Sequence, residues 1–212
     1  ERWAVVDAAR KELFSAFNRR SFAHPKVKIT YADARRYMNV TRKQYDVIIS
    51  EPSNPWIAGV ASLFTADFYE RAAEVLKPDG IFAQWVQLYE LDPEDLRMIL
   101  QEVQRRFPEM SAWVVGGDLI LIASRQPQHL KIDRIVQLVK SDPSVAADFR
   151  NYMRTTAPEG MLAYYVMSTE AIRKFASTDR RNSDDHPILE FHAPQNLFNS
   201  VQIGRASCRE RV

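Results

Sequence analysis

Cysteine and long apolar runs are nearly missing from this sequence of 212 residues. Cys208 is the only cysteine and lies near the carboxyl terminus, so the preceding residues offer no disulfide and no thiolate nucleophile or metal ligand. The longest apolar stretch, residues 113–123, is interrupted by Asp118 and is too short to cross a bilayer as a helix. We therefore expect no disulfide framework and no cysteine chemistry, and we expect this part of the protein not to be inserted in a membrane.

The patterns that identify common metal, phosphate and hydrolase sites are also missing. The four histidines are scattered, and no pair has the spacing that puts two ligands on one helix face, so the sequence predicts no metal site. Gly116 and Gly117, among only six glycines, fit a hairpin turn rather than a strand-to-helix loop that cradles a pyrophosphate. No Gly-x-Ser-x-Gly elbow follows any predicted strand, which argues against serine hydrolysis.

Basic and acidic residues are equal in number when the carboxyl-terminal residues are left out. Residues 203–212 resemble the translation of a sequencing adapter, so we treat residues 202–212 as a probable non-native tail. Without residues 203–212 the chain has 26 basic and 26 acidic residues, and the electrostatic signature of nucleic-acid binding is absent. We expect no nucleic-acid partner. The start at Glu1, without methionine and inside a predicted helix, suggests a fragment of a longer protein.

The central feature of the sequence is the stretch from residue 45 to residue 68, which predicts a strand, then a polar loop, then a helix. Val47, Ile48 and Ile49 form an uninterrupted β-branched run, typical of a parallel strand buried on both faces. Pro52 and Pro55 prevent both strand continuation and helix entry, so an irregular loop must follow. Ligands of open α/β sheets bind beyond the carboxyl ends of the strands, where this loop would lie.

Hydrophobic periodicity and turn residues predict the other elements. We expect helices over residues 4–17, 62–76, 93–107, 130–140 and 168–175, strands over residues 26–31, 81–88, 110–115, 119–124 and 188–191, a turn at residues 77–80, and a polar loop over residues 180–187. Asp92 and Pro93 suit the N-cap and first position of one helix, and Gly116-Gly117-Asp118 suits a hairpin that makes the last strand pair antiparallel.

Helices alternating with strands and ending in an antiparallel hairpin predict an α/β fold with a three-layer arrangement. After Ser124 helical patterns dominate and indicate a small helical appendage. We therefore expect a partial Rossmann-like domain over residues 1–126 and a helical carboxyl-terminal appendage over residues 127–201, followed by the tail.

Two acidic residues follow predicted strands. Glu51 comes directly after residues 45–50, and Asp33 follows residues 26–31. In a doubly wound sheet both would face one crevice, where one carboxylate can accept hydrogen bonds from a ligand and the other can take a proton. The structural alternatives are a solvated turn acid for Glu51 and a helix N-cap for Asp33.

The loop after Glu51 also carries an amide beside an aromatic ring. Asn54 and Trp56 would suit a pocket for a planar or cationic substrate, although loop packing is the more common use of a tryptophan such as Trp56 taken by itself. Tyr89 and Glu90 follow the next predicted strand and would border the same crevice. Asn54 and Trp56 are therefore the candidates for substrate binding.

Assembled in order, these residues resemble the polyamine aminopropyltransferases, the spermidine synthase family, of the S-adenosylmethionine-dependent methyltransferase-like Rossmann superfamily. The resemblance extends from Ala4 to about Phe198 and rests mainly on Asp33-Ala34-Arg35, on residues 45–51 and 62–69, and on Asp79-Gly-Ile-Phe-Ala-Gln84. Two segments are closer still to bacterial members of the family that are fused behind a membrane-embedded region. They are Ser-Glu-Pro-Ser-Asn-Pro-Trp at residues 50–56 and Asn182-Ser-Asp-Asp-His-Pro. This resemblance implies a methyltransferase-like fold without its first strands and a cytoplasmic domain whose parent protein is anchored at the inner membrane.

The resemblance also implies roles for individual residues. Asp33 matches the acid that contacts the adenine amino group of the donor, with Ala34 beside it. Glu51 matches the first acid of an Asp-x-x-Asp motif, the proposed proton acceptor and the expected catalytic residue. Asn54 falls where the second acid belongs, so half of the amine-binding carboxylate pair is replaced by an amide, and residues 114–118 replace a Pro-Thr-Tyr-Pro-like segment.

The implied reaction transfers an aminopropyl group from decarboxylated S-adenosylmethionine to a small-molecule amine in polyamine biosynthesis, without a metal. Because part of the domain lies before Glu1 in this resemblance, we expect the fragment itself to bind the donor poorly and to be inactive. One alternative is an S-adenosylmethionine-dependent methyltransferase, in which Asn54-Pro55-Trp56 is a degenerate motif of amino-group methylation. The other is a non-catalytic nucleoside-sensing domain of a membrane protein.

Overall fold

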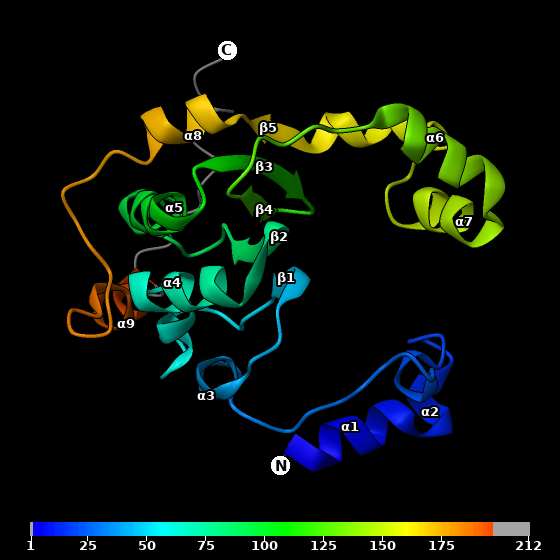
Figure 1. The fold of residues 1–212 in the computed structure, drawn as a ribbon, viewed down its shortest axis with the longest axis horizontal. Coiled ribbons are helices and arrows are strands. Elements are labelled where there is room, and N and C mark those ends of the chain that lie inside the picture. Colours follow the sequence, from blue (N-terminus) through cyan, green and yellow to red (C-terminus); the bar gives the residue numbers. More distant parts are fainter. Residues whose placement is uncertain (1, 197–212) are drawn as a thin grey trace. The chain divides into compact units, whose positions relative to one another are not determined.

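The computed structural model describes residues 2–196, which fall into two compact units divided between Thr41 and Arg42 (Figure 1). The predicted non-native tail, residues 202–212, lies outside the described residues. Among residues 2–196 no helix combines the length and the apolar character that crossing a bilayer requires. The predicted boundary after residue 126 remains a prediction.

The first unit is helical and contains α1 (Arg2–Arg10), α2 (Glu12–Ser15), the 3-10 helix η1 (Ser21–Ala23) and α3 (Ala34–Val40). The single helix expected over residues 4–17 is interrupted at Lys11, whose backbone is extended. The strand expected over residues 26–31 is wrong, because these residues form a turn and irregular backbone. A strand needs a neighbouring strand for its hydrogen bonds, and the described part of the first unit provides none.

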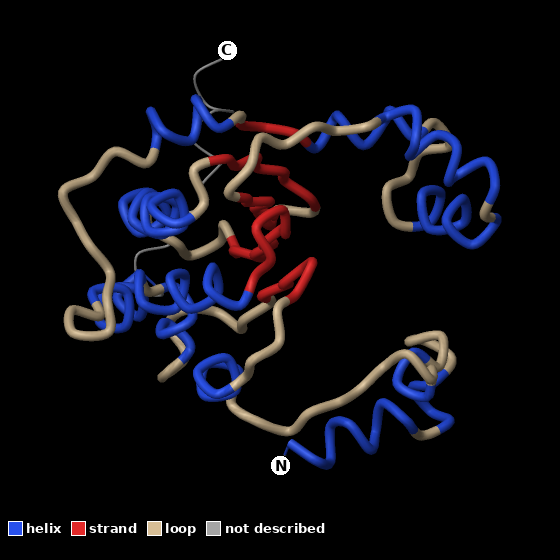
Figure 2. The backbone as a smooth tube through the Cα atoms, in the orientation of Figure 1, coloured by secondary structure: helices blue, strands red, loops and turns tan. Residues whose placement is uncertain are grey.

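The second unit is built on one five-stranded mixed sheet with the order β1-β2-β4-β3-β5 (Figure 2). The strands are β1 (Tyr45–Ser50), β2 (Leu76–Gln87), β3 (Glu109–Val115), β4 (Asp118–Ser124) and β5 (Tyr165–Met167). β1 and β2 are parallel, whereas β2–β4, β3–β4 and β3–β5 are antiparallel. The four longer strands predicted from the sequence therefore share one sheet, and the α/β class is confirmed.

Local sequence signals account for the hairpin and for the longest helix. Gly116 and Gly117 have φ values of 64° and 99°, which side chains with a Cβ rarely adopt, and they connect β3 to β4. Helix α5 (Pro93–Arg106) begins as expected, with the Asp92 side chain accepting a hydrogen bond from the Glu94 amide at 2.8 Å. Both elements form where turn and cap chemistry specify them.

Other boundaries differ from the expectations. The helix predicted over residues 62–76 is divided at Thr65 into the 3-10 helix η2 (Val60–Phe64) and α4 (Ala66–Val75), because the Thr65 side chain caps α4. The turn predicted at residues 77–80 lies within β2, at a register shift against β1. The short strand predicted at residues 188–191 is wrong, since these residues open helix α9 (Ile188–Asn196). A four-residue segment with three apolar residues does not distinguish a strand from a helical turn.

The remaining elements of the second unit follow the hairpin. They are α6 (Ile132–Ser141), α7 (Pro143–Asn151), the 3-10 helix η3 (Pro158–Tyr164) and α8 (Thr169–Phe175). In Figure 1, α4, α5 and α9 lie on the same side of the sheet, while α6 and α7 extend from the end that carries β5. The predicted helices over residues 130–140 and 168–175 are thus present.

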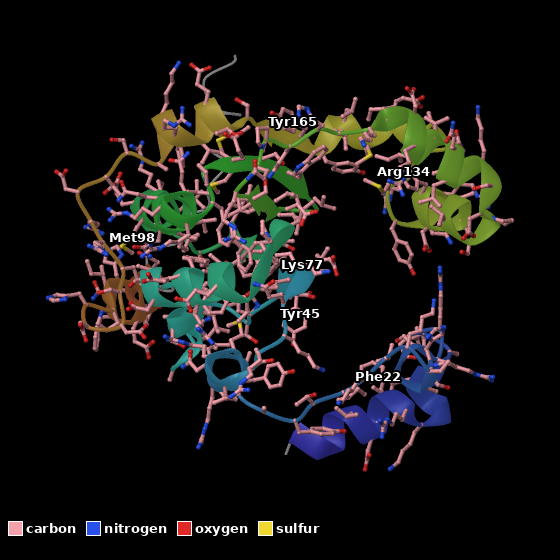
Figure 3. The ribbon with its side chains drawn as sticks, viewed as in Figure 1. Phe22, Tyr45, Lys77, Met98, Arg134 and Tyr165 are labelled. Carbon is pink, nitrogen blue, oxygen red and sulfur yellow. The ribbon has the colours of Figure 1, made fainter. Side chains whose placement is uncertain are left out.

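The core lies between the sheet and the α4–α5 layer. The Phe82 ring on β2 stacks on Phe107 at the end of α5, with a centroid separation of 5.1 Å, and meets Tyr69 of α4 edge-on. Met98 is fully buried in the same layer, where its side chain lies among many others (Figure 3). These large side chains hold α4 and α5 against one face of the sheet.

The expectation that β1 is buried on both faces is wrong. Val47 is 51% exposed and Ile49 is 74% exposed, because β1 is an edge strand of the described sheet and these side chains face away from the α4–α5 layer. At the start of β1, the Asp46 carboxylate pairs with Lys77 Nζ at 2.6 Å, which lowers the pKa of Asp46. The three-layer arrangement expected from the sequence remains a prediction.

Candidate functional site

The candidate site is built on the loop that follows β1. Glu51 comes directly after Ser50, the last residue of β1, and its side chain is exposed. Pro52 and Pro55 are buried, and residues 51–54 have no regular structure, as the prolines predict. In the parallel pair Ser50 lies opposite Gln84 of β2, so Glu51 emerges at the carboxyl end of β1, beside the last residues of β2. An exposed carboxylate there can accept a proton from a bound ligand.

Asn54, Trp56 and Tyr89 come together beside this strand end. The Tyr89 hydroxyl lies 3.1 Å from Asn54 Oδ1 and donates a hydrogen bond to it. The Trp56 and Tyr89 rings meet edge-on, with centroids 5.9 Å apart and planes inclined by 68°. Three of the residues that the sequence marked as bordering a crevice therefore form one cluster. Its amide N–H groups and aromatic faces can contact a polar or cationic ligand.

Backbone strain is present next to the cluster. Glu90, the residue after Tyr89, has a φ of 53°, in the left-handed region that non-glycine residues rarely occupy. Such residues persist where the surrounding structure fixes them, and they are frequent near binding sites. The strained residue thus lies directly after Tyr89, just beyond the end of β2.

Asp33 and Ala34 lie in the first unit, and Glu51, Asn54 and Trp56 lie in the second. Asp33 is the N-cap of α3, and its Oδ1 accepts a hydrogen bond from the Arg36 amide at 2.9 Å. Ala34 is the first residue of that helix, and both residues are exposed. The capping role weighed from the sequence is therefore present, and a second role for Asp33 in ligand binding remains a prediction.

The far end of the loop is fixed by residues that the sequence analysis did not select. The Gly59 amide donates a hydrogen bond to Glu190 Oε1 at 3.0 Å, and the Gly59 carbonyl accepts one from Ser62 Oγ at 2.7 Å. Glu190 is 131 positions away along the chain. No local sequence pattern predicts a contact between residues that are so far apart in the chain.

Buried ionisable groups with shifted pKa values lie in the helical layer. Burial raises the pKa of Asp95 on α5, although His192 Nδ1 at 2.8 Å and the Asn196 amide at 3.0 Å oppose the shift. Burial likewise raises the pKa of Glu102. These groups join α5 to the carboxyl-terminal segment.

One cavity of the second unit lies apart from the loop, and the described residues form no cluster that could hold a metal ion. Within residues 2–196 no group of three or more histidine, cysteine or acidic side chains is placed to hold a metal ion. A cavity of about 460 Å³ lies over the β2–β4–β3 part of the sheet, between Ile81, Trp113 and Tyr164. None of the predicted site residues lines it.

Comparison with known protein families gives a match that includes the loop after β1. The profile of the spermine/spermidine synthase domain matches residues 3–117. A polyamine aminopropyltransferase of Synechococcus sp. (strain JA-2-3B'a(2-13)) is 37% identical over 146 residues, which cover 62% of this chain and 46% of the relative. A polyamine aminopropyltransferase of Thermotoga petrophila is 28% identical over 104 residues, which cover 49% of this chain and 34% of the relative. The chain thus spans between a third and a half of the length of these two curated relatives.

Solved structures show a related fold. A crystal structure of a spermidine synthase in complex with the transition-state analogue AdoDATO superposes with a TM-score of 0.51 at 21% identity, covering 82% of this chain and 56% of that chain. The crystal structure of a probable spermidine synthase from Corynebacterium glutamicum gives a TM-score of 0.50 at 18% identity, covering 81% and 60%. At these identities the similarity concerns the fold.

Proposed function

Because the chain belongs to the spermine/spermidine synthase domain family, we propose that the protein moves an aminopropyl group from decarboxylated S-adenosylmethionine to an amine. The observation that carries the proposal is the exposed Glu51 carboxylate at the carboxyl end of β1, followed by the loop that joins Asn54 and Trp56 to Tyr89. The curated relatives named above are polyamine aminopropyltransferases, which supports the same class of reaction.

In the proposed reaction Glu51 removes a proton from the acceptor amine. Alkyl ammonium groups have pKa values near ~10.4, so the amine arrives protonated and needs a nearby acceptor before its nitrogen can attack. The nitrogen then forms a bond to the aminopropyl carbon next to the sulfonium sulfur, the carbon–sulfur bond breaks, and its electron pair remains on the sulfur of methylthioadenosine. Glu51 holds the proton that the amine has lost.

The other candidate residues bind rather than react. Asn54 and Trp56 would hold the amine, through the amide and through the aromatic ring, which attracts a cationic group. Asp33, with Ala34, would contact the adenine of the donor. Much of the rate enhancement of such a displacement comes from holding the two reactants in line.

The proposal extends to the protein that contains this chain. It includes the three-layer, Rossmann-like methyltransferase fold, a cytoplasmic position for this domain, anchoring of the parent protein at the bacterial inner membrane, and catalysis without a metal. These points rest on the resemblance of residues 33–35, 45–56 and 182–187 to that group of proteins.

Transfer assays on the intact protein with both donors test the proposal. We expect release of methylthioadenosine from decarboxylated S-adenosylmethionine in the presence of an amine, and no methyl transfer from S-adenosylmethionine. Glu51→Gln keeps the size of the side chain and removes the proton acceptor, so turnover should fall by about 10²–10⁴-fold while nucleoside binding persists. Glu170→Gln, on the exposed surface of α8, is the matched control. Methyl transfer, or unchanged turnover in Glu51→Gln, would contradict the proposal.

A further inference from the structure

The 3-10 helix η2, which follows the candidate loop, is tied at both ends to one distant segment, residues 182–190. At its start, the Gly59 amide donates to Glu190 Oε1 at 3.0 Å. At its end, Asn182 Nδ2 donates to the Phe64 carbonyl at 3.0 Å, and the Ala66 amide donates to the Asn182 carbonyl at 2.9 Å. The loop and η2 are therefore placed by contacts that are distant in sequence.

Asn182 makes this segment a rigid support. The Asn182 side chain is fully buried. Its backbone N–H donates to Glu102 Oε1 at 3.1 Å, and its side-chain Oδ1 accepts from the Leu189 backbone amide at 3.2 Å. Together with the two bonds to Phe64 and Ala66, these contacts use the backbone and side-chain groups of Asn182 in a buried network. Buried polar groups that are fully paired specify one arrangement of the elements they join.

Asp184 adds a further connection to the same junction. The Thr65 hydroxyl donates to Asp184 Oδ1 at 2.8 Å, and the Asp184 amide donates to Asp67 Oδ2 at 2.8 Å. Thr65 is the N-cap residue of α4, so residues 182–184 hold the point where η2 ends and α4 begins.

Helix α9, which carries Glu190, is in turn fixed to α5. Leu189 is fully buried, His192 Nδ1 lies 2.8 Å from Asp95 Oδ1, and Asn196 Nδ2 donates to Asp95 Oδ2 at 3.0 Å. Because α9 is anchored at these points, the Glu190 carboxylate is presented to Gly59 at a defined place. A carboxylate acceptor gives a stronger bond to a backbone N–H than a neutral acceptor does.

Gly59 is suited to receive this bond. Its φ of 80° is in the left-handed region, and a Cβ built there would meet no atom within 4 Å. The glycine is therefore required by the backbone conformation rather than by crowding. With its carbonyl held by Ser62 and its amide held by Glu190, Gly59 fixes the end of the loop that carries Asn54 and Trp56.

We propose that Glu190 is a positioning residue for the candidate site: its carboxylate, by binding the Gly59 amide, holds the 51–59 loop in the conformation that joins Asn54 and Trp56 to Tyr89. Its consequence for catalysis rests on the proposed aminopropyl transfer, whereas its consequence for the loop does not. Loss of the bond should loosen the loop and leave α5 and the sheet intact.

Hydrogen exchange of the chain, followed by mass spectrometry, tests the loop directly. In Glu190→Ala we expect the protection of the Gly59 amide and its neighbours in residues 56–62 to fall by about tenfold, the effect of losing one hydrogen bond to a charged acceptor. Glu190→Gln retains an oxygen acceptor and should stay close to wild type. Glu190→Asp keeps the charge but draws the carboxylate back, so it should resemble Glu190→Ala. Glu170→Ala, on α8, is the surface control.

The results separate the positioning role from a general loss of stability and from the chemistry. Unchanged exchange at residues 56–62 in Glu190→Ala and Glu190→Asp would overturn the proposal, and so would equal loosening of α5 in the Asp variant. In transfer assays a positioning role predicts a larger increase in KM for the amine than decrease in kcat, with recovery in Glu190→Gln. If the intact wild-type protein transfers no aminopropyl group, the proposed function fails, while the exchange result still decides the role of Glu190.

Discussion

Asn54 has no charge with which to hold the far ammonium group of a diamine, and its Oδ1 already accepts a hydrogen bond from Tyr89. The amide oxygen therefore has one further lone pair to offer an ammonium group, but without the negative charge that would strengthen the contact, and the amide N–H donors do not suit a cation. A carboxylate at this position could accept from the Tyr89 hydroxyl and still present an oxygen to a cation. The identity of this one side chain should thus affect which amines the protein accepts.

We predict that Asn54→Asp raises kcat/KM for putrescine by about tenfold, equivalent to ~1.4 kcal/mol of transition-state stabilisation. Steady-state kinetics on the intact protein with decarboxylated donor measure the change. Asn151→Asp adds the same charge at the exposed end of α7 and serves as the control. An efficient wild type together with a neutral or harmful Asn54→Asp would show that another group supplies the missing charge.

Tyr69 is a second residue whose polar side-chain group is not matched by its surroundings. The side chain is fully buried, its hydroxyl has no hydrogen-bond partner among the described residues, and burial raises the pKa of Tyr69 well above its usual value. Burying an unpaired hydroxyl costs free energy that a phenylalanine would not incur.

We predict that Tyr69→Phe increases the free energy of unfolding by about 1 kcal/mol. Urea unfolding of the variant and wild type measures the difference. The matched control is Tyr164→Phe, because the Tyr164 hydroxyl donates to the Met153 carbonyl at 3.0 Å and its removal should be neutral or destabilising. Destabilisation by Tyr69→Phe would mean that the hydroxyl is paired in solution.

Among the elements, α5 carries buried carboxyl groups that make stability depend on pH. Burial is the largest influence on Glu102 and raises its pKa above the usual 4.5, although Arg105 and the Asn182 amide oppose the shift. The folded protein therefore binds the proton more tightly than the unfolded chain does. The stabilisation from this group is complete below the unfolded pKa and is lost as the pH rises through the folded pKa.

We predict that Glu102→Gln becomes progressively more favourable relative to wild type as the pH rises from about 4 to about 7. Glutamine keeps an oxygen that can accept from Asn182 but carries no charge to bury. Denaturant unfolding across this range gives the difference in free energy at each pH, with the exposed Glu170→Gln as the control. A difference that is constant with pH, or that changes in the opposite direction, would contradict the assigned shift of Glu102.

The elements that sequence reasoning placed correctly are those specified by their own residues. Asp92 and Pro93 define the start of α5, and Gly116 and Gly117 define the hairpin. The errors concern segments whose state depends on a neighbour. Residues 26–31 alternate like a strand but have no strand partner among the described residues of their unit. Three of the four residues 188–191 are apolar, but the segment forms the start of a helix.

The same distinction applies to the candidate site. The loop after β1 and the nearness of Tyr89 follow from the order of strands, so Asn54, Trp56 and Tyr89 could be grouped from the sequence. The contact of Glu190 with Gly59 could not, because it depends on where α9 packs. Charge and hydrophobic patterns describe one element at a time and contain little information about such packing.

For the whole molecule, the distribution of buried side chains predicts unequal stability of the two units. Among the side chains that the structure describes, Met38 is the one buried apolar residue of the first unit, while all the other core residues belong to the second. Hydrophobic burial is the main favourable contribution to folding, and the described side chains of α1 and α3 contribute little of it. The sheet and α5, by contrast, contain fully buried residues such as Phe82, Met98 and Leu121.

We therefore predict that the backbone amides of α1 and α3 exchange with solvent at least about 100-fold faster than those of α5 and β4, because they open without global unfolding. Residues 42–201, expressed alone, should keep a cooperative thermal transition close to that of the whole chain, since the core residues other than Met38 remain. Exchange measured on the whole chain and a melting curve of the shorter chain provide the two tests. Equal protection in α3 and α5, together with a non-cooperative transition for residues 42–201, would mean that the two units unfold as one and that the first contributes to the core of the second.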